Sequence, residues 1–308
     1  IMGFQAYDII GDIHGHADEL VKLLSHLEYQ DSSDGYFHES RKVIFLGDFI
    51  DRGEKLVQHK QVLKIVMDMV QHENALAVMG NHEFNALAYH TEHDGQFLRQ
   101  HTPANNDQHK AFLNEYPEDS AEKRAVLDFF YGLPLWLELE GLRVIHACWD
   151  DRYIRVIRAL CPSIRLDKKS LIDAATKGTK AYQAIEILLK GFEYELPDGI
   201  SFQDKGGKQR TAARLQWWKR DASQLGELVL PDGLNIGDAA KVAVPTDIPV
   251  YSSNAPPCFV GHYWLDGKPA PLASNVACLD YSVANQGKLV AYRWDGEQVL
   301  DKNKFCFN

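Results

Sequence analysis

The chain lacks several features that identify secreted, membrane-spanning and nucleic-acid-binding proteins. Its five cysteines are widely spaced and odd in number, with no CxxC pair. The sequence therefore predicts neither a disulfide framework nor a zinc knuckle, and it favours a reducing, cytoplasmic setting. No apolar run approaches the length of a membrane span, and we expect no secretory signal in residues 1–8. The net charge of −10 argues against long nucleic acids as partners, because these need a basic face.

Three glycine-bounded motifs dominate what is present. GDIHG at 11–15, GDFIDRG at 47–53 and GNHE at 80–83 follow the short apolar runs YDII, VIFL and ALAVM. Such runs predict buried strands that end in tight turns. Helical periodicity predicts helices over about 17–28 and 56–72, and a third helix starts near Glu83. This alternation indicates an α/β architecture, in which the ends of neighbouring strands meet at one edge of a sheet.

The tips of these motifs carry oxygen and nitrogen donors that suit divalent metal ions. Asp12 and His14 are two residues apart on an extended segment, so their side chains point to the same side and can hold one ion. Asp48 offers two carboxylate oxygens and is the natural bridge to a second ion. Asn81 can offer only a neutral amide oxygen.

Two further histidines are candidates for the same donor set. His146 ends the strand-like run LRVIH, and His262 ends CFVGH. A lone histidine at a strand end is more often a satisfied, partly buried residue than a ligand. Here the three ordered motifs demand additional donors, so we expect both histidines to be ligands.

Three polar residues of the motifs suit roles other than metal binding. Arg52 has a planar fork of donors that matches two phosphate oxygens. His82, adjacent to Asn81, can donate a proton to a leaving oxygen. Asp51 could orient His82 and stabilise its protonated form.

Together these motifs resemble the calcineurin-like metallophosphoesterases, in the form of the phosphoprotein phosphatase branch. That branch includes bacterial Ser/Thr protein phosphatases, symmetrical diadenosine tetraphosphatases and the phosphatase module of polynucleotide kinase-phosphatases. The resemblance implies an α/β fold, a two-sheet sandwich flanked by helices. It also implies a site for two divalent metal ions formed by Asp12, His14, Asp48, Asn81, His146 and His262, with Arg52 on the phosphate and His82 and Asp51 as the proton-donor pair.

The resemblance implies hydrolysis of phosphate monoesters, in a phosphoprotein or a small phosphorylated molecule, by attack of a water that bridges the two metals. Manganese is the preferred metal, and iron or zinc stays open. One alternative is a phosphoanhydride hydrolase of the symmetrical diadenosine tetraphosphatase type. A catalytically silent binding module is a remote alternative, because Arg52 and His82 are retained with a full ligand set. The run HACWDD, where the branch usually has glycines after the histidine, leaves the substrate class open.

The last strand-like runs return to the motif-bearing region, so the chain is divided by an insert. We expect 1–150 and 251–308 to form the catalytic domain and 151–250 to form a cap over the active site. The branch usually has a further phosphate-binding arginine, for which Arg152, Arg155 and Arg214 are all candidates. Trp218 could stack on a substrate ring, although packing is the commoner role of a large aromatic side chain.

The polar segment 91–120 is expected to be a long surface loop. His90 and His93 have a spacing loosely typical of metal ligands. No strand end precedes them, so a solvated face is the favoured interpretation.

Overall fold

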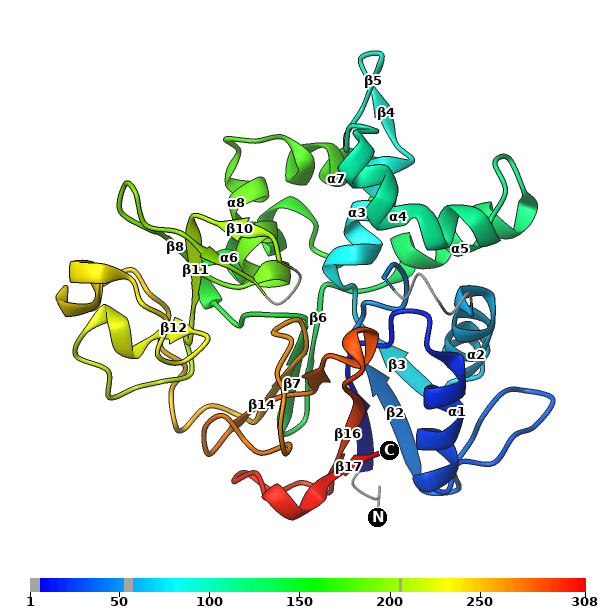
Figure 1. The fold of residues 1–308 in the computed structure, drawn as a ribbon. Coiled ribbons are helices and arrows are strands. Elements are labelled where there is room, and N and C mark those ends of the chain that lie inside the picture. The colour runs from blue at the N-terminus through cyan, green and yellow to red at the C-terminus, as the bar shows by residue number, and fades with distance from the viewer. Residues whose placement is uncertain (1–5, 53–57, 205–206) are drawn as a thin grey trace.

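Two β-sheets packed face to face form the centre of the computed structural model, which describes residues 6–52, 58–204 and 207–308 (Figure 1). The first sheet has the order β15-β16-β1-β2-β3, with β17 paired to β16, and β1, β2 and β3 are parallel. The second has the order β14-β13-β7-β6, with β14, β13 and β7 parallel. The strands are β1 (Ala6–Ile10), β2 (Arg41–Phe45), β3 (Ala75–Ala77), β6 (Trp136–Leu139), β7 (Leu142–Ile145), β13 (Cys258–Val260), β14 (Val276–Cys278), β15 (Asp280–Tyr281), β16 (Lys288–Trp294) and β17 (Phe305–Phe307).

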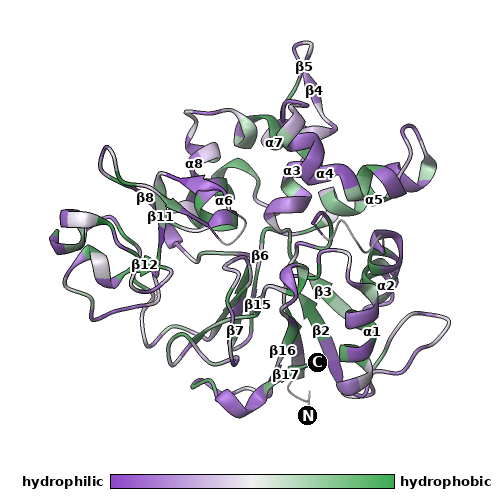
Figure 2. Ribbon diagram, viewed as in Figure 1, coloured by the Kyte–Doolittle hydropathy of each residue, from purple (hydrophilic) through white to green (hydrophobic). Residues whose placement is uncertain are grey.

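Alternation of side chains along the strands builds two apolar layers. Ile9 and Ile10 are both fully buried, but Ile9 packs between the sheets whereas Ile10 packs against the helices. Phe259 of the second sheet belongs to the same inter-sheet cluster as Ile9. The apolar colouring of the central strands in Figure 2 follows this arrangement. The expected two-sheet α/β sandwich is confirmed.

Helices cover the outer faces of the sandwich. They are α1 (Ala17–His26), α2 (His59–Gln71), α3 (Asn81–Tyr89), α4 (Pro103–Glu115), α5 (Ala121–Gly132), α6 (Asp151–Leu160), α7 (Lys168–Ala175) and α8 (Lys180–Lys190), with 3-10 turns at Leu225–Glu227, Gly237–Lys241, Val283–Asn285 and Lys302–Lys304. The helix expected over 17–28 ends two residues earlier, at His26. The helix expected over 56–72 is α2, and the part of that prediction before residue 58 lies outside the described residues. Helix α8 ends at Gly191, whose φ of +86° is tolerated because glycine has no side chain.

The expected long loop over 91–120 is wrong, because the segment contains α4 and two short paired strands at Glu92–His93 and Gln96–Phe97. Thr102 caps α4 by accepting a hydrogen bond from the Asn105 amide, and Pro103 occupies the first helical position. The polar composition hides a short buried face formed by His109, Ala111 and Phe112. The Thr-Pro start signal was present in the sequence, but the apolar periodicity was too weak to support it.

The segment expected to form the insert divides into two kinds of structure. Helices α6, α7 and α8 bury their apolar faces in the same cluster as α1 and α2. The following segment has its own apolar cluster and lies to the left of the two sheets in Figure 1. Its strands are β8 (Glu193–Glu195), β9 (Phe202–Gln203), β10 (Gln209–Arg210), β11 (Ala212–Leu215) and β12 (Val229–Leu230), and the hairpin at the top of Figure 1 is β4 (Glu92–His93) with β5 (Gln96–Phe97). We call residues 192–248 the lateral lobe.

Among the described residues, no helix combines the length and the apolar character needed to cross a bilayer.

The buried carboxylate of Asp8 connects strand β1 to three polar side chains, and its removal should destabilise the fold. Asp8, which is fully buried, accepts hydrogen bonds from the Tyr29 hydroxyl at 3.0 Å, Arg41 Nε at 3.0 Å and Arg293 Nε at 3.1 Å. Asp8→Ala leaves both guanidinium groups without this partner, so we expect the free energy of unfolding to fall by about 3 kcal/mol. Urea denaturation measures this loss. The exposed Asp31→Ala is the control, and equal midpoints for the two variants would refute the role of Asp8.

Candidate metal centre

The three motifs meet at the carboxyl ends of three parallel strands. Asp12 follows β1, Asp48 follows β2, and Asn81 begins α3 directly after β3 and its glycine turn. From the second sheet, His146 follows β7 and His262 follows β13. The sandwich therefore brings both sets of strand ends to one edge, where all of these side chains are buried.

The Asp48 carboxylate lies at the middle of this group. Its Oδ2 is 3.7 Å from His14 Nε2, 3.3 Å from His146 Nε2 and 4.0 Å from His82 Nε2. Its Oδ1 accepts a hydrogen bond from the His82 amide at 3.0 Å. Burial by itself would raise the pKa of Asp48, but the nearby histidines outweigh burial and hold this pKa well below its usual range. Asp48 is therefore a carboxylate that faces histidines on two sides.

Asn81 and Asp12 complete the group. The Asn81 Oδ1 atom is 3.0 Å from His146 Nε2 and 2.8 Å from His262 Nδ1. Asp12 Oδ2 is 3.9 Å from His14 Nε2 and accepts from the His262 amide at 3.1 Å. The six residues expected to bind metal thus form one continuous cluster.

Two sets of three side chains, one of which includes the expected proton donor His82 beside the cluster, have ligand atoms close enough together to hold an ion. One consists of His14, Asp48 and His82, the other of Asp48, His146 and His262, and Asp48 is common to both. Among the described residues, His14 Nε2 and His262 Nε2 are buried nitrogens without a hydrogen-bond partner. Burial lowers the pKa of His14 to about 3 and that of His262 well below its usual range, so both imidazoles are neutral. A neutral imidazole with a free lone pair is the form that binds a cation.

The backbone of the site is strained and tightly packed. Positive φ angles occur at His14 (45°), Asp48 (53°) and His262 (73°), where ordinary residues rarely adopt them. A Cβ atom at Gly80 would lie 2.3 Å from Asp48 Oδ1, so only glycine allows this approach. Glu83 holds the geometry: its carboxylate accepts from the amides of Asp48 at 2.8 Å and Gly80 at 2.9 Å.

The expected proton-donor pair is formed by direct contact. His82 Nδ1 donates to Asp51 Oδ2 at 2.7 Å, which leaves His82 Nε2 facing Asp48. Arg52 stacks on Trp264, with its guanidinium carbon 3.8 Å from the ring centroid. Burial lowers the pKa of Arg52, and its Nε has no hydrogen-bond partner among the described residues.

The three candidate substrate contacts differ in position. Arg214, on β11 of the lateral lobe, brings Nη1 to 3.5 Å from the His262 carbonyl oxygen. After burial, the charge of Arg214 is the next cause of the low pKa of His262. Arg152 is instead held by Asp150 at 2.6 Å and by the Asp247 carbonyl at 2.7 Å. None of the contacts described for Arg152 is with the metal-cluster residues.

Trp218, offered by the sequence as a possible stacking surface for a substrate ring, takes the commoner packing role in this structure. Its side chain is 2% exposed and packs edge-on against Trp217 and Tyr263. Trp217 donates to the carbonyl oxygen of Ala147 at 3.2 Å, directly behind His146. The tryptophan pair anchors the lateral lobe to the strand ends. His93, for which a solvated face was favoured over metal binding, is exposed, and its Nε2 lies 3.4 Å from Asp94 Oδ2.

Three residues near the site were not assigned roles from the sequence. Glu83 lies within the GNHE motif, and the motif itself was the available signal. Trp264 follows His262 by two residues, but nothing in the sequence shows that its ring reaches Arg52. His109, which donates to Asp51 at 2.7 Å, comes from a helix that the sequence did not predict.

Part of the chain is similar in sequence to known bacterial proteins. Bis(5'-nucleosyl)-tetraphosphatase PrpE (asymmetrical) of Oceanobacillus iheyensis is 31% identical over 141 residues, which make up 46% of this chain and 54% of that protein. The protein of the same name from Geobacillus sp. is 45% identical over 76 residues, 24% of this chain and 30% of its own length. The chain thus spans about half or less of the length of these relatives.

Solved structures share the fold. A mutant of a cold-active protein tyrosine phosphatase aligns with a TM-score of 0.51 and 18% identity, over 96% of this chain and 80% of that one. A protein serine/threonine phosphatase from Saccharomyces cerevisiae aligns with a TM-score of 0.50 and 13% identity, over 98% and 78%. The family profile described as calcineurin-like phosphoesterase matches residues 7–172, more than half of the 308 residues. The chain therefore belongs to the calcineurin-like phosphoesterase family.

Proposed function

We propose that this chain is a phosphoesterase that depends on two divalent metal ions and hydrolyses phosphate monoesters. The observation that carries the proposal is the pair of buried three-residue groups that share the Asp48 carboxylate. Oxygen and imidazole donors, with two partnerless nitrogens on His14 and His262, fit divalent cations well. We propose Asp12, His14, Asp48, Asn81, His146 and His262 as the ligands. Manganese is the preferred ion, and iron and zinc are the alternatives, because oxygen and imidazole donors do not distinguish the three.

The metal ions would supply Lewis acidity, which lowers the pKa of water and offsets charge on a phosphate. Side chains of the protein bind the phosphate and donate the proton. Arg52, stacked on Trp264, presents its guanidinium group to phosphate oxygens, and Arg214 approaches from the lateral lobe. His82 donates a proton from Nε2 to the leaving oxygen, because its Nδ1 is engaged by Asp51.

The substrate class has two candidates. A monoester of a phosphoprotein or a small molecule requires only the metal cluster and the arginines. The second candidate is a phosphoanhydride of the dinucleoside polyphosphate type. The names of the two bacterial relatives support it, although those names specify asymmetrical cleavage and the sequence suggested the symmetrical kind.

We also propose that residues 151–250 act as the cap of a catalytic domain formed by 1–150 and 251–308. The support is that Arg214 of the lateral lobe reaches His262, and that Trp217 joins the lobe to the strand end after β7. The free cysteines support a reducing cytoplasm as the location.

A substrate panel tests the function. With added manganese we expect turnover of p-nitrophenyl phosphate, phosphopeptides or nucleotides. We expect none after prolonged chelation, because the ions that would supply the Lewis acidity are then removed. Dinucleoside tetraphosphate is included, and its products distinguish symmetrical from asymmetrical cleavage. Full activity of protein shown by elemental analysis to be metal-free would overturn the mechanism.

His82→Ala tests the proton donor. We expect turnover to fall by roughly 10²- to 10⁴-fold while the metal content stays near that of the unmodified protein. The loss should be smaller for p-nitrophenyl phosphate than for an alkyl phosphate, because p-nitrophenolate leaves without protonation. Equal losses on both substrates would argue against an acid role.

Arg214→Ala tests the contribution of the lateral lobe. Loss of a hydrogen bond to a charged phosphate costs about 1.5–3 kcal/mol, so kcat/KM should fall about 10- to 100-fold. Arg210→Ala, on the same lobe but paired with Asp204, is the matched control and should change little. If the two variants behave alike, Arg214 has no role in substrate binding.

A further inference from the structure

We propose that His109 is a positioning residue that fixes the carboxylate of Asp51 and, through it, the orientation of His82. His109 Nδ1 donates to Asp51 Oδ1 at 2.7 Å, and His82 Nδ1 donates to Asp51 Oδ2 at 2.7 Å. Each carboxylate oxygen is thus held by a different histidine. This inference rests on the proposed role of His82 as the proton donor.

Burial makes the second hydrogen bond important. The exposed fraction is 1% for His82, 2% for Asp51 and 4% for His109, so water is largely excluded from the contact. Rotation of an aspartate carboxylate about its last side-chain bond is only weakly restricted. If only one oxygen is held, the plane of the carboxylate can turn, and the Oδ2 atom that accepts from His82 then moves. With both oxygens held, the plane is fixed.

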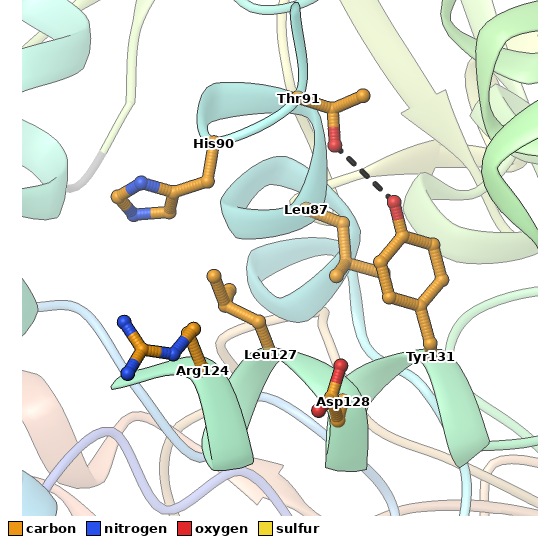
Figure 3. A pocket seen from close by; sticks show the side chains of 7 residues that line it. All are labelled: Leu87, His90, Thr91, Arg124, Leu127, Asp128 and Tyr131. Atoms are coloured by element: carbon orange, nitrogen blue, oxygen red, sulfur yellow. Dashed lines mark hydrogen bonds between the residues drawn. The ribbon is translucent and has the colours of Figure 1, made fainter. Parts of the chain in front are cut away.

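Besides Asp51, His109 contacts Phe112 and His90. Its ring stacks on Phe112 at 4.7 Å between centroids, and its Nε2 lies 3.2 Å from His90 Nε2. Burial lowers the pKa of His90 to about 3, so His90 is neutral. His90 also lines a cavity of about 220 Å³ together with Leu87, Thr91, Arg124, Leu127, Asp128 and Tyr131 (Figure 3). The row His82–Asp51–His109–His90 therefore extends from the site to this cavity.

The geometry favours orientation over proton transport. His82 would lose its proton from Nε2, whereas the row ends on Nδ1, which already carries the hydrogen donated to Asp51. A proton arriving along the row would have no free position on His82. What the row supplies is a fixed ring orientation, with Nε2 directed toward Asp48.

Two substitutions at one position separate this role from simple packing. In His109→Asn the amide nitrogen takes the place of Nδ1, so the hydrogen bond to Asp51 is kept. In His109→Gln the amide nitrogen takes the place of Nε2 and points toward His90, so that bond is lost. We expect His109→Gln to lower kcat on an alkyl phosphate by roughly 10- to 100-fold, and His109→Asn to keep most of it. For His109→Gln the loss on p-nitrophenyl phosphate should be smaller, with metal content unchanged.

His101→Leu is the matched control. Like His109, His101 stacks on an aromatic ring, here that of Tyr89, but its Nε2 bonds to the Tyr89 carbonyl oxygen and not to Asp51. In His101→Leu the ratio of kcat on the alkyl phosphate to kcat on p-nitrophenyl phosphate should equal that of the unmodified protein. The inference is overturned if His109→Gln and His109→Asn lose activity equally, or if either loss follows only the drop in melting temperature.

Comparison with His82→Ala keeps the two proposals apart. If His82→Ala shows no leaving-group dependence, the acid role fails and this inference fails with it. If His82→Ala shows the dependence and His109→Gln does not, only the role of His109 is refuted.

Discussion

The buried negative charge of Asp48 is the constraint on which the rest of the site depends. A carboxylate removed from water is costly unless it is paired and hydrogen-bonded. Here the cost is offset from several directions, since His146 lies 3.3 Å and His14 3.7 Å from Oδ2, and the His82 amide donates to Oδ1. These partners come from both sheets, so the charge can be accommodated only when the sandwich is complete.

The same constraint explains the backbone of the site. Asp48 itself has a φ of 53°, and Gly80 approaches its carboxylate too closely to tolerate a side chain. Conformations of this kind persist only when the surroundings enforce them. Glu83 provides that enforcement, because its single carboxylate accepts from the amides of Asp48, Phe49 and Gly80. The motif GNHE therefore carries a structural residue beside its proposed chemical ones.

The surroundings of the cluster come from segments that carry no motif. Arg214 belongs to the lateral lobe and reaches the carbonyl of His262, and Trp217 fixes that lobe behind His146. His109 belongs to α4 and donates a hydrogen bond to Oδ1 of Asp51. We infer that the motifs supply the reacting groups, whereas these segments supply their orientation and the access of substrate.

Sequence alone determined the strand ends that carry Asp12, Asp48 and Asn81, because strand, glycine turn and helix are local signals. The two-sheet sandwich was predicted from the resemblance of the motifs to a known family. The sequence also predicted that His146 and His262 end two further strands near the motifs; their role as metal ligands is a proposal. It could not determine that α4 exists, since its buried face is short and polar, or that Trp218 is buried, since burial depends on distant partners. Contacts between residues far apart in the chain, such as His109 with Asp51, are decided only when the sheets and helices pack together.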